Sequence, residues 1–95
     1  MREITIARNY AETLLALAKA AGAPEAWGTM MDEAAAALGS PSIEAVMMSP
    51  RVTKERKVEI IRHALAGAPA PFILFLAAVV KRGRQMLLPR IADEY

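Results

Sequence analysis

The chain has 95 residues, of which 55% are hydrophobic and 5% aromatic, and a formal net charge of +2. It contains no cysteine, which excludes disulfide bonds and thiolate metal sites. Its longest apolar stretch, residues 72–80, has about half of the roughly 18 residues that a membrane-spanning helix needs, so we expect no direct membrane insertion. The length fits one domain with a core of small aliphatic side chains.

Charge is distributed unevenly along the sequence. Residues 1–50 carry three basic and six acidic side chains, whereas residues 51–90 carry nine basic and two acidic ones. This asymmetry predicts a surface with regions of both signs rather than a uniformly basic protein, and it makes the 51–90 region a candidate for binding an anionic partner.

Glycine and proline divide the first two thirds of the chain into four segments whose apolar residues recur with helical spacing. Helices are predicted over residues 4–21 and 24–38, and from Ser40-Pro41 to Met48. A fourth helix follows Thr53, whose hydroxyl makes it a good N-cap. The core stripe of this fourth helix is predicted to be Val58, Ile61, Ala64 and Leu65, with the stem of Lys57 also inside the apolar arc.

The last third of the chain predicts two further helices. One spans residues 71–83 and ends at a glycine, and the other follows that glycine. Pro89 allows either a turn over residues 84–88 followed by a helix that begins near Pro89, or a kink at Pro89. We therefore predict an all-α fold, a compact single-domain bundle of six short helices over residues 1–95. The chain stops at Tyr95 in mid-pattern and without a cap, which predicts that it is part of a longer protein.

The stretch PFILFLAAVVKRG, residues 71–83, carries more apolar surface than one core needs. On a helical wheel Phe72, Phe75 and Val79 fall together, whereas Leu74 and Ala78 point elsewhere, toward Arg82. Two interpretations are open. Either this is a central helix that the other five cover, or its second face is left uncovered.

The first helix offers a neighbour for that second face. Asn9, Thr13, Ala16 and Ala20 form a small, uncharged strip along one side of it. An apolar groove between two helices, with Arg82 at its rim, is a common receptor for an amphipathic helix. A protein-binding module is therefore the functional class that the residues favour.

Enzymatic chemistry has little support in the residues. The single histidine, His63, falls on a charged helix face, and there is no His/Cys cluster for a metal and no glycine-rich loop for phosphate. Each serine at positions 40, 42 and 49 adjoins a proline, as helix caps do, and none has a base beside it. We expect no catalytic residues, no metal site and no cofactor.

Nucleic-acid binding is the main alternative, through the basic residues of region 51–90. A recognition helix presents its basic residues on one exposed face. Here Glu55 and Glu59 interrupt that face, and Lys81 and Arg82 stand at a helix C-terminus, where cations suit the helix dipole. A generic adaptor or nucleic-acid-binding domain is therefore kept only as the second interpretation.

Several segments resemble a known family. The opening IARNYAETLLALA contains an Ala-Arg-x-Tyr-Ala motif before an alanine-rich helix, and EAWGTMM, SPRVTKERKVEII and KRGRQMLLPRIADEY follow in the expected order. Together these segments are similar to the delta subunit of bacterial F-type ATP synthase, called the oligomycin sensitivity-conferring protein in mitochondria. The resemblance covers essentially all 95 residues.

The resemblance implies a six-helix N-terminal domain and a non-catalytic stator subunit of the proton-translocating ATP synthase. In the family this domain holds the N-terminal helix of an alpha subunit in a groove between helices 1 and 5. Carried over to this sequence, that groove comprises Ile6, Tyr10, Thr13 and Leu17 on the first helix, and Leu74, Phe75, Ala78 and Arg82 on the fifth.

The resemblance also implies features beyond this stretch of chain. Family members continue into a C-terminal domain that contacts the peripheral stalk b subunit, and this chain lacks that domain. The expected location is the cytoplasmic face of the bacterial plasma membrane, peripherally, as part of the ATP synthase complex. No nucleic acid is expected among the partners.

Overall fold

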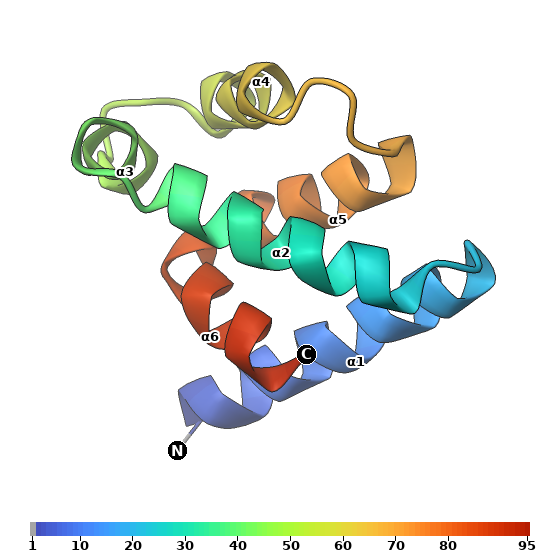
Figure 1. The fold of residues 1–95 in the computed structure, drawn as a ribbon. Coiled ribbons are helices and arrows are strands. Elements are labelled where there is room, and N and C mark those ends of the chain that lie inside the picture. The colour runs from blue at the N-terminus through green and yellow to red at the C-terminus, as the bar shows by residue number, and fades with distance from the viewer. Residues whose placement is uncertain (1) are drawn as a thin grey trace.

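The computed structural model describes residues 2–95. Over this range the chain forms six α-helices and one short 3-10 helix, with no strand. The elements are α1 (Arg2–Ala20), α2 (Pro24–Leu38), α3 (Pro41–Met48), α4 (Lys54–Ala64), α5 (Ala70–Lys81), η1 (Gln85–Leu87) and α6 (Leu88–Glu94). The predicted all-α bundle of six short helices is confirmed (Figure 1).

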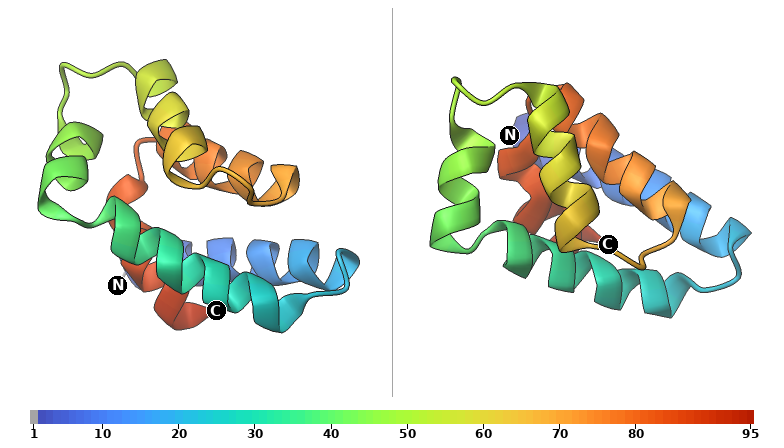
Figure 2. Two further views of the ribbon diagram at one scale, coloured as in Figure 1. Left: turned by 45° about the horizontal axis from the view of Figure 1, so that its top comes forward. Right: turned by 90° about the horizontal axis from the view of Figure 1, so that it is seen from above.

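The helices form two layers. One layer holds α1, α2 and α6, and the other holds α4 and α5, while α3 closes one side (Figure 2). The closest packing partners are α1 with α6 and α4 with α5. The radius of gyration is 12.4 Å, close to the value of about 13 Å expected for a compact domain of 100 residues.

Local signals place the helix ends where the sequence predicts them. Proline stands in the first turn of α2, α3, α5 and α6, where its missing N–H costs no helical hydrogen bond. Thr53 caps α4, because its hydroxyl accepts a hydrogen bond from the backbone N–H of Arg56 at 3.1 Å. Two arrangements were predicted around Pro89, and the structure has the turn followed by a helix rather than the kink. The turn contains η1, and Pro89 stands in the first turn of α6.

The end of α5 depends on Gly83. Its φ of 71° lies in the left-handed region, which a side chain disfavours. From there the Gly83 N–H donates to the carbonyl of Val80 at 2.8 Å, and the Arg84 N–H donates to that of Val79 at 3.1 Å. This pair of bonds is a Schellman motif, and it turns the chain sharply from α5 into η1.

The core is aliphatic around one aromatic contact. Trp27 and Phe72 meet edge to face with their ring centroids 5.6 Å apart, which joins α2 to α5. Leu14, Met31, Ile61, Leu76 and Ile91 are fully buried around them. Aromatic side chains are few, so the helices are held together mainly by small and medium-sized aliphatic groups.

The predicted core stripe of α4 is wrong at one residue. Val58 and Ile61 are buried and Leu65 is half-buried, but Ala64 is exposed. A hollow of about 270 Å³, lined partly by Met30, Phe72 and the segment 64–68, separates the last turn of α4 from α2. The prediction that the stem of Lys57 lies within the apolar arc of α4 is supported, because only 7% of this residue is exposed.

The C-terminal end of the chain lies against α1 and the start of α2 (Figure 1). Arg8 Nε pairs with Glu94 Oε1 at 3.2 Å. Tyr95 donates its hydroxyl hydrogen to the carbonyl oxygen of Pro24. A Cβ added at Gly28 would stand 2.8 Å from the Tyr95 ring, so the absence of a side chain at Gly28 makes room for that ring.

Candidate protein-binding surface

Helices α1 and α5 lie side by side and run antiparallel (Figures 1 and 2). Their contact centres on Tyr10 and Phe75, whose rings meet edge to face with centroids 6.1 Å apart and planes at 85°. The start of α1 therefore lies beside the end of α5, and the end of α1 beside the start of α5. We name the strip of residues along this junction the α1–α5 surface. It consists of the eight residues predicted from the family resemblance: Ile6, Tyr10, Thr13, Leu17, Leu74, Phe75, Ala78 and Arg82.

The α1 side of this surface changes from half-buried to exposed along the helix. Ile6 and Tyr10 are partly buried and pack against the core. Thr13 is exposed, and 37% of Leu17 is accessible. These four residues recur at spacings of four, three and four, which places them on one face of a helix.

The α5 side contains the most exposed large apolar residue of the described chain. Leu74 is 61% exposed and Ala78 is exposed beside it, whereas Phe75 is only 6% exposed. Phe75 therefore lies beneath the surface and supports it. Arg82 continues the row of Leu74 and Ala78 at four-residue spacing and is exposed.

This exposure decides between the two interpretations of the stretch 71–83. A helix covered by the other five would bury Leu74 and Ala78, and it does not. Six residues of α5 are buried: Phe72, Phe75, Leu76, Ala77, Val79 and Val80. The same helix thus contributes one face to the core and leaves a second, apolar face uncovered.

The polar groups at the centre of the α1–α5 surface, those of Thr13 and Tyr10, offer little to a partner. The hydroxyl of Thr13 already donates to the carbonyl of Asn9 at 3.1 Å. The hydroxyl oxygen of Tyr10 is buried and has no hydrogen-bond partner within residues 2–95. Recognition at the centre of this surface must therefore depend on apolar contact and shape.

A second exposed apolar site escaped the sequence analysis. Met48 is 46% exposed and Met86 is 53% exposed. Both line a hollow of about 180 Å³ between the end of α2, α3 and η1, together with Leu38, Met47 and Leu88. The only sequence signal was the methionine content of these segments, which does not reveal that the turn at Gly83 brings them together.

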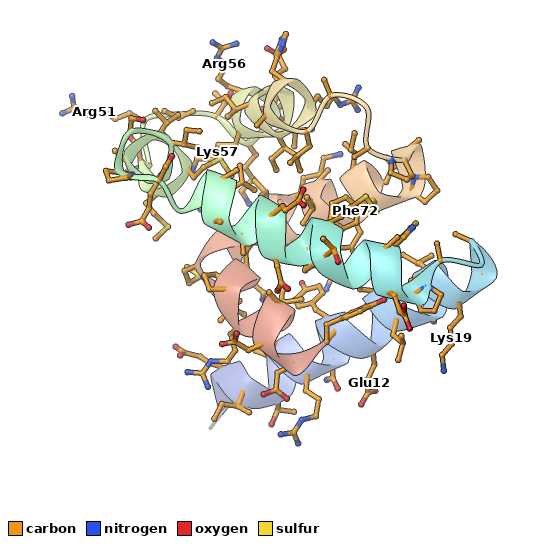
Figure 3. The ribbon with its side chains drawn as sticks, in the orientation of Figure 1. Glu12, Lys19, Arg51, Arg56, Lys57 and Phe72 are labelled. Carbon is orange, nitrogen blue, oxygen red and sulfur yellow. The ribbon has the colours of Figure 1, made fainter. Side chains whose placement is uncertain are left out.

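The basic residues of region 51–90 do not form one free basic face. Arg56 Nη1 pairs with Glu59 Oε2 at 3.0 Å within α4, and Lys57 is buried. Lys54 Nζ donates to the backbone carbonyl of Lys81 at 2.7 Å, which joins the start of α4 to the end of α5. Figure 3 shows Arg51, in the segment between α3 and α4, and Arg56, on α4, projecting away from the bundle in different directions.

Residues 2–95 show no grouping for metal binding, since nowhere do three His, Asp or Glu side chains converge. His63 is exposed on α4. None of the helices described is long and apolar enough to cross a membrane.

The fold and its exposed surface thus define a small all-α domain with an uncovered apolar strip along α1 and α5. A family model described as "ATP synthase delta (OSCP) subunit" matches residues 6–95. The chain belongs to this ATP synthase delta (OSCP) subunit family.

Curated relatives agree with the family match. The ATP synthase subunit delta of Gemmatimonas aurantiaca is 41% identical over 93 residues, which cover 96% of this chain and 50% of that protein. The subunit delta of Ectopseudomonas mendocina is 33% identical over 92 residues, covering 96% and 52%, and that of Burkholderia ambifaria is 38% identical over 96 residues, covering 96% and 52%. The chain therefore spans about half the length of the curated relatives it matches. No solved structure was matched.

Proposed function

We propose that this chain is the N-terminal domain of a stator subunit of an F-type ATP synthase. In this role it holds the catalytic head to the peripheral stalk by binding the N-terminal helix of an alpha subunit on the α1–α5 surface. The observation that carries the proposal is that two helices in contact with each other each leave a leucine exposed, Leu17 at 37% on α1 and Leu74 at 61% on α5. Large apolar side chains left uncovered on neighbouring helices are typical of sites that another chain covers.

The apolar character of the surface suits a stator. Interactions between exposed charges weaken as salt rises, whereas the burial of apolar area does not. Covering a few hundred Å² of apolar area at about 25 cal/mol per Å² contributes several kcal/mol, from which the cost of ordering the partner helix is subtracted. A clamp of this kind resists rotor torque without catalytic groups of its own.

The remaining parts of the proposal concern the complete subunit. A second domain following this one would contact the b subunit of the peripheral stalk. The subunit would lie at the cytoplasmic face of the bacterial plasma membrane and support proton-driven ATP synthesis without being catalytic itself. Family membership supports this assignment.

The proposal is tested with Ala78→Asp. This change puts a carboxylate in the middle of the apolar strip, where a bound helix would have to desolvate it. We expect binding of a peptide from the N-terminus of the alpha subunit, measured by calorimetry, to be abolished while circular dichroism and the unfolding midpoint stay close to wild type. Ala78 is exposed, so the folded bundle accommodates the new side chain.

Ala36→Asp is the matched control. Ala36 is also an exposed alanine near the C-terminal end of a helix, α2, and it lies outside the α1–α5 surface. Its variant should bind the peptide as wild type does. Unchanged affinity in Ala78→Asp would refute the assignment of the surface.

A further inference from the structure

We propose that the α1–α5 surface is electrically polarised along its length and therefore accepts its partner helix in one direction. In this arrangement acidic side chains in the partner's first turn lie beside Lys81 and Arg82, and the partner runs antiparallel to α5 and parallel to α1. The inference rests on the proposed function, because it presupposes that a helix binds to this surface.

One end of the surface is basic. Lys81 and Arg82 are both exposed at the end of α5, and Lys54 of α4 joins them through its bond to the Lys81 carbonyl. The ion pairs described for residues 2–95 are Arg8–Glu94 and Arg56–Glu59, so Lys81 and Arg82 have no acidic partner within this range. Arg82 also stands in line with Leu74 and Ala78, so its charge lies at the end of the apolar row.

At the other end no charged side chain lies on the α1–α5 surface itself. This end consists of the last turns of α1 and the first turn of α5, where Leu17, Ala20, Pro71 and Leu74 are exposed. The charged residues of α1 nearest to it, Glu12 and Lys19, project from the side of α1 that faces away from α5 (Figure 3). A bound helix therefore meets cations at one end only.

The dipole of α5 does not account for these cations. Cations are favoured near a helix C-terminus because they compensate its partial negative charge. Lys54 already fulfils that role here, since its ammonium group bonds directly to the Lys81 carbonyl at 2.7 Å. The side chains of Lys81 and Arg82 remain available to an outside group.

Acidic residues near the basic end do not cancel its charge. Glu3 stands in the first turn of α1, at the same end of the bundle, and is exposed. It forms no ion pair within the described range, and in that turn it complements the dipole of α1. Glu55 stands next to Lys54 in the first turn of α4 and is also exposed. Against these two carboxylates stand three cations, Lys54, Lys81 and Arg82, so the end as a whole keeps a net positive charge.

The chemistry of helices then sets the direction of the partner. Acidic side chains are favoured in the first turn of a helix for the same dipole reason. A partner whose first turn is acidic gains most when that turn lies beside Lys81 and Arg82. Its helix is then antiparallel to α5, which also opposes the two helix dipoles.

The test uses two versions of the alpha-subunit N-terminal peptide with the same apolar face and composition. One version carries two glutamates in its first turn, and the other carries them in its last turn, with glutamine at the vacated positions. Calorimetry at low salt should show the first version binding about threefold to tenfold more tightly, the range that one or two exposed ion pairs supply. The difference should shrink at high salt.

The variant Lys81→Gln/Arg82→Gln separates this contact from any effect of the glutamates on peptide helicity. On this variant the difference in affinity between the two peptides should shrink to the part that their helicities alone cause, whereas on Lys19→Gln the full difference should persist. A nitroxide on the N-terminus of the first peptide should broaden the amide signals of Lys81 and Arg82 and leave those of Leu17 and Leu74 sharper.

The outcomes distinguish the two proposals. Equal binding of both peptides to the wild-type chain, or broadening at Leu17 and Leu74 instead, overturns the direction while leaving the surface assignment intact. Failure of every peptide to bind overturns the proposed function and, with it, the direction.

Discussion

Two of the neighbours of helix α1, α6 and α5, differ in how the contact is completed. Toward α6 the junction is closed by the Arg8–Glu94 ion pair, and the Tyr95–Pro24 hydrogen bond ties the end of the chain to the start of α2 next to it. Toward α5 the helices meet at Tyr10 and Phe75, and the strip above this contact stays exposed. The side of α1 toward α6 therefore contributes to the stability of the fold, whereas the side toward α5 leaves an exposed strip that we propose binds a partner.

The comparison predicts that two truncations of similar size lower the free energy of unfolding by very different amounts. Ile91→Ala on α6 removes a side chain that is 0% exposed, so it should lower the free energy of unfolding by about 2–5 kcal/mol. Leu74→Ala on α5 removes one that is 61% exposed, so it should change stability by less than about 0.5 kcal/mol. Urea unfolding followed by circular dichroism measures both. Similar losses of unfolding free energy in the two variants would contradict the division between a side of α1 that stabilises the fold and a side that is left exposed.

Tyr95 gives a test of the closed side that depends on pH. Burial raises the pKa of the Tyr95 hydroxyl above its usual value of 10.0. A raised pKa in the folded state means that the neutral form is favoured there, so the associated stability is present below pH 10 and is lost as pH rises through the folded pKa. Tyr95→Phe removes this dependence together with the bond to Pro24.

The difference in stability between wild type and Tyr95→Phe is therefore expected to narrow as pH rises. At pH 7 Tyr95→Phe should be less stable than wild type by about 0.5–1.5 kcal/mol, the usual net value of one hydrogen bond. Above pH 10 the two unfolding midpoints should converge, since only the wild type must lose a proton at residue 95 on unfolding. A gap that stays constant up to pH 11 would mean that the hydroxyl is not held in its neutral form.

The smallest effect is expected at the Arg8–Glu94 pair. Its side chains are 59% and 26% exposed, so water and salt screen the attraction. A double-mutant cycle with Arg8→Ala and Glu94→Ala should give a coupling of about 0.2–1 kcal/mol that falls with added salt. A coupling above this range would show that the pair is a main support of the closed side.

Much of the fold could be predicted because its signals are local. Prolines and glycines mark the ends of α2 and α3, the hydroxyl of Thr53 marks the start of α4, and the wheel of residues 71–83 separates Leu74 and Ala78 from the core face. These features depend on residues within a few positions of one another. Spacing alone is sufficient to place them.

The features that could not be predicted join residues far apart in sequence. The Tyr95–Pro24 bond spans 71 positions and the Arg8–Glu94 pair spans 86, and no periodicity encodes such partners. The exposure of Ala64 likewise follows from a hollow beside α2 rather than from its own helix. Within the candidate surface the helical wheel separated Leu74 and Ala78 from the face that carries Phe75, but the edge-to-face contact of Phe75 with Tyr10 on α1 required the structure.

The packing of α1 against α6 has a consequence for synthesis of the protein. Most helical bundles fold through contacts that are close in sequence, but here the first helix finds its most extensive contacts on the last one. On the ribosome α1 therefore emerges long before the helix that holds it in place. The α1–α6 packing can form only when residues 88–95 have left the ribosome, so a nascent chain completes the proposed binding surface late in the synthesis of this domain.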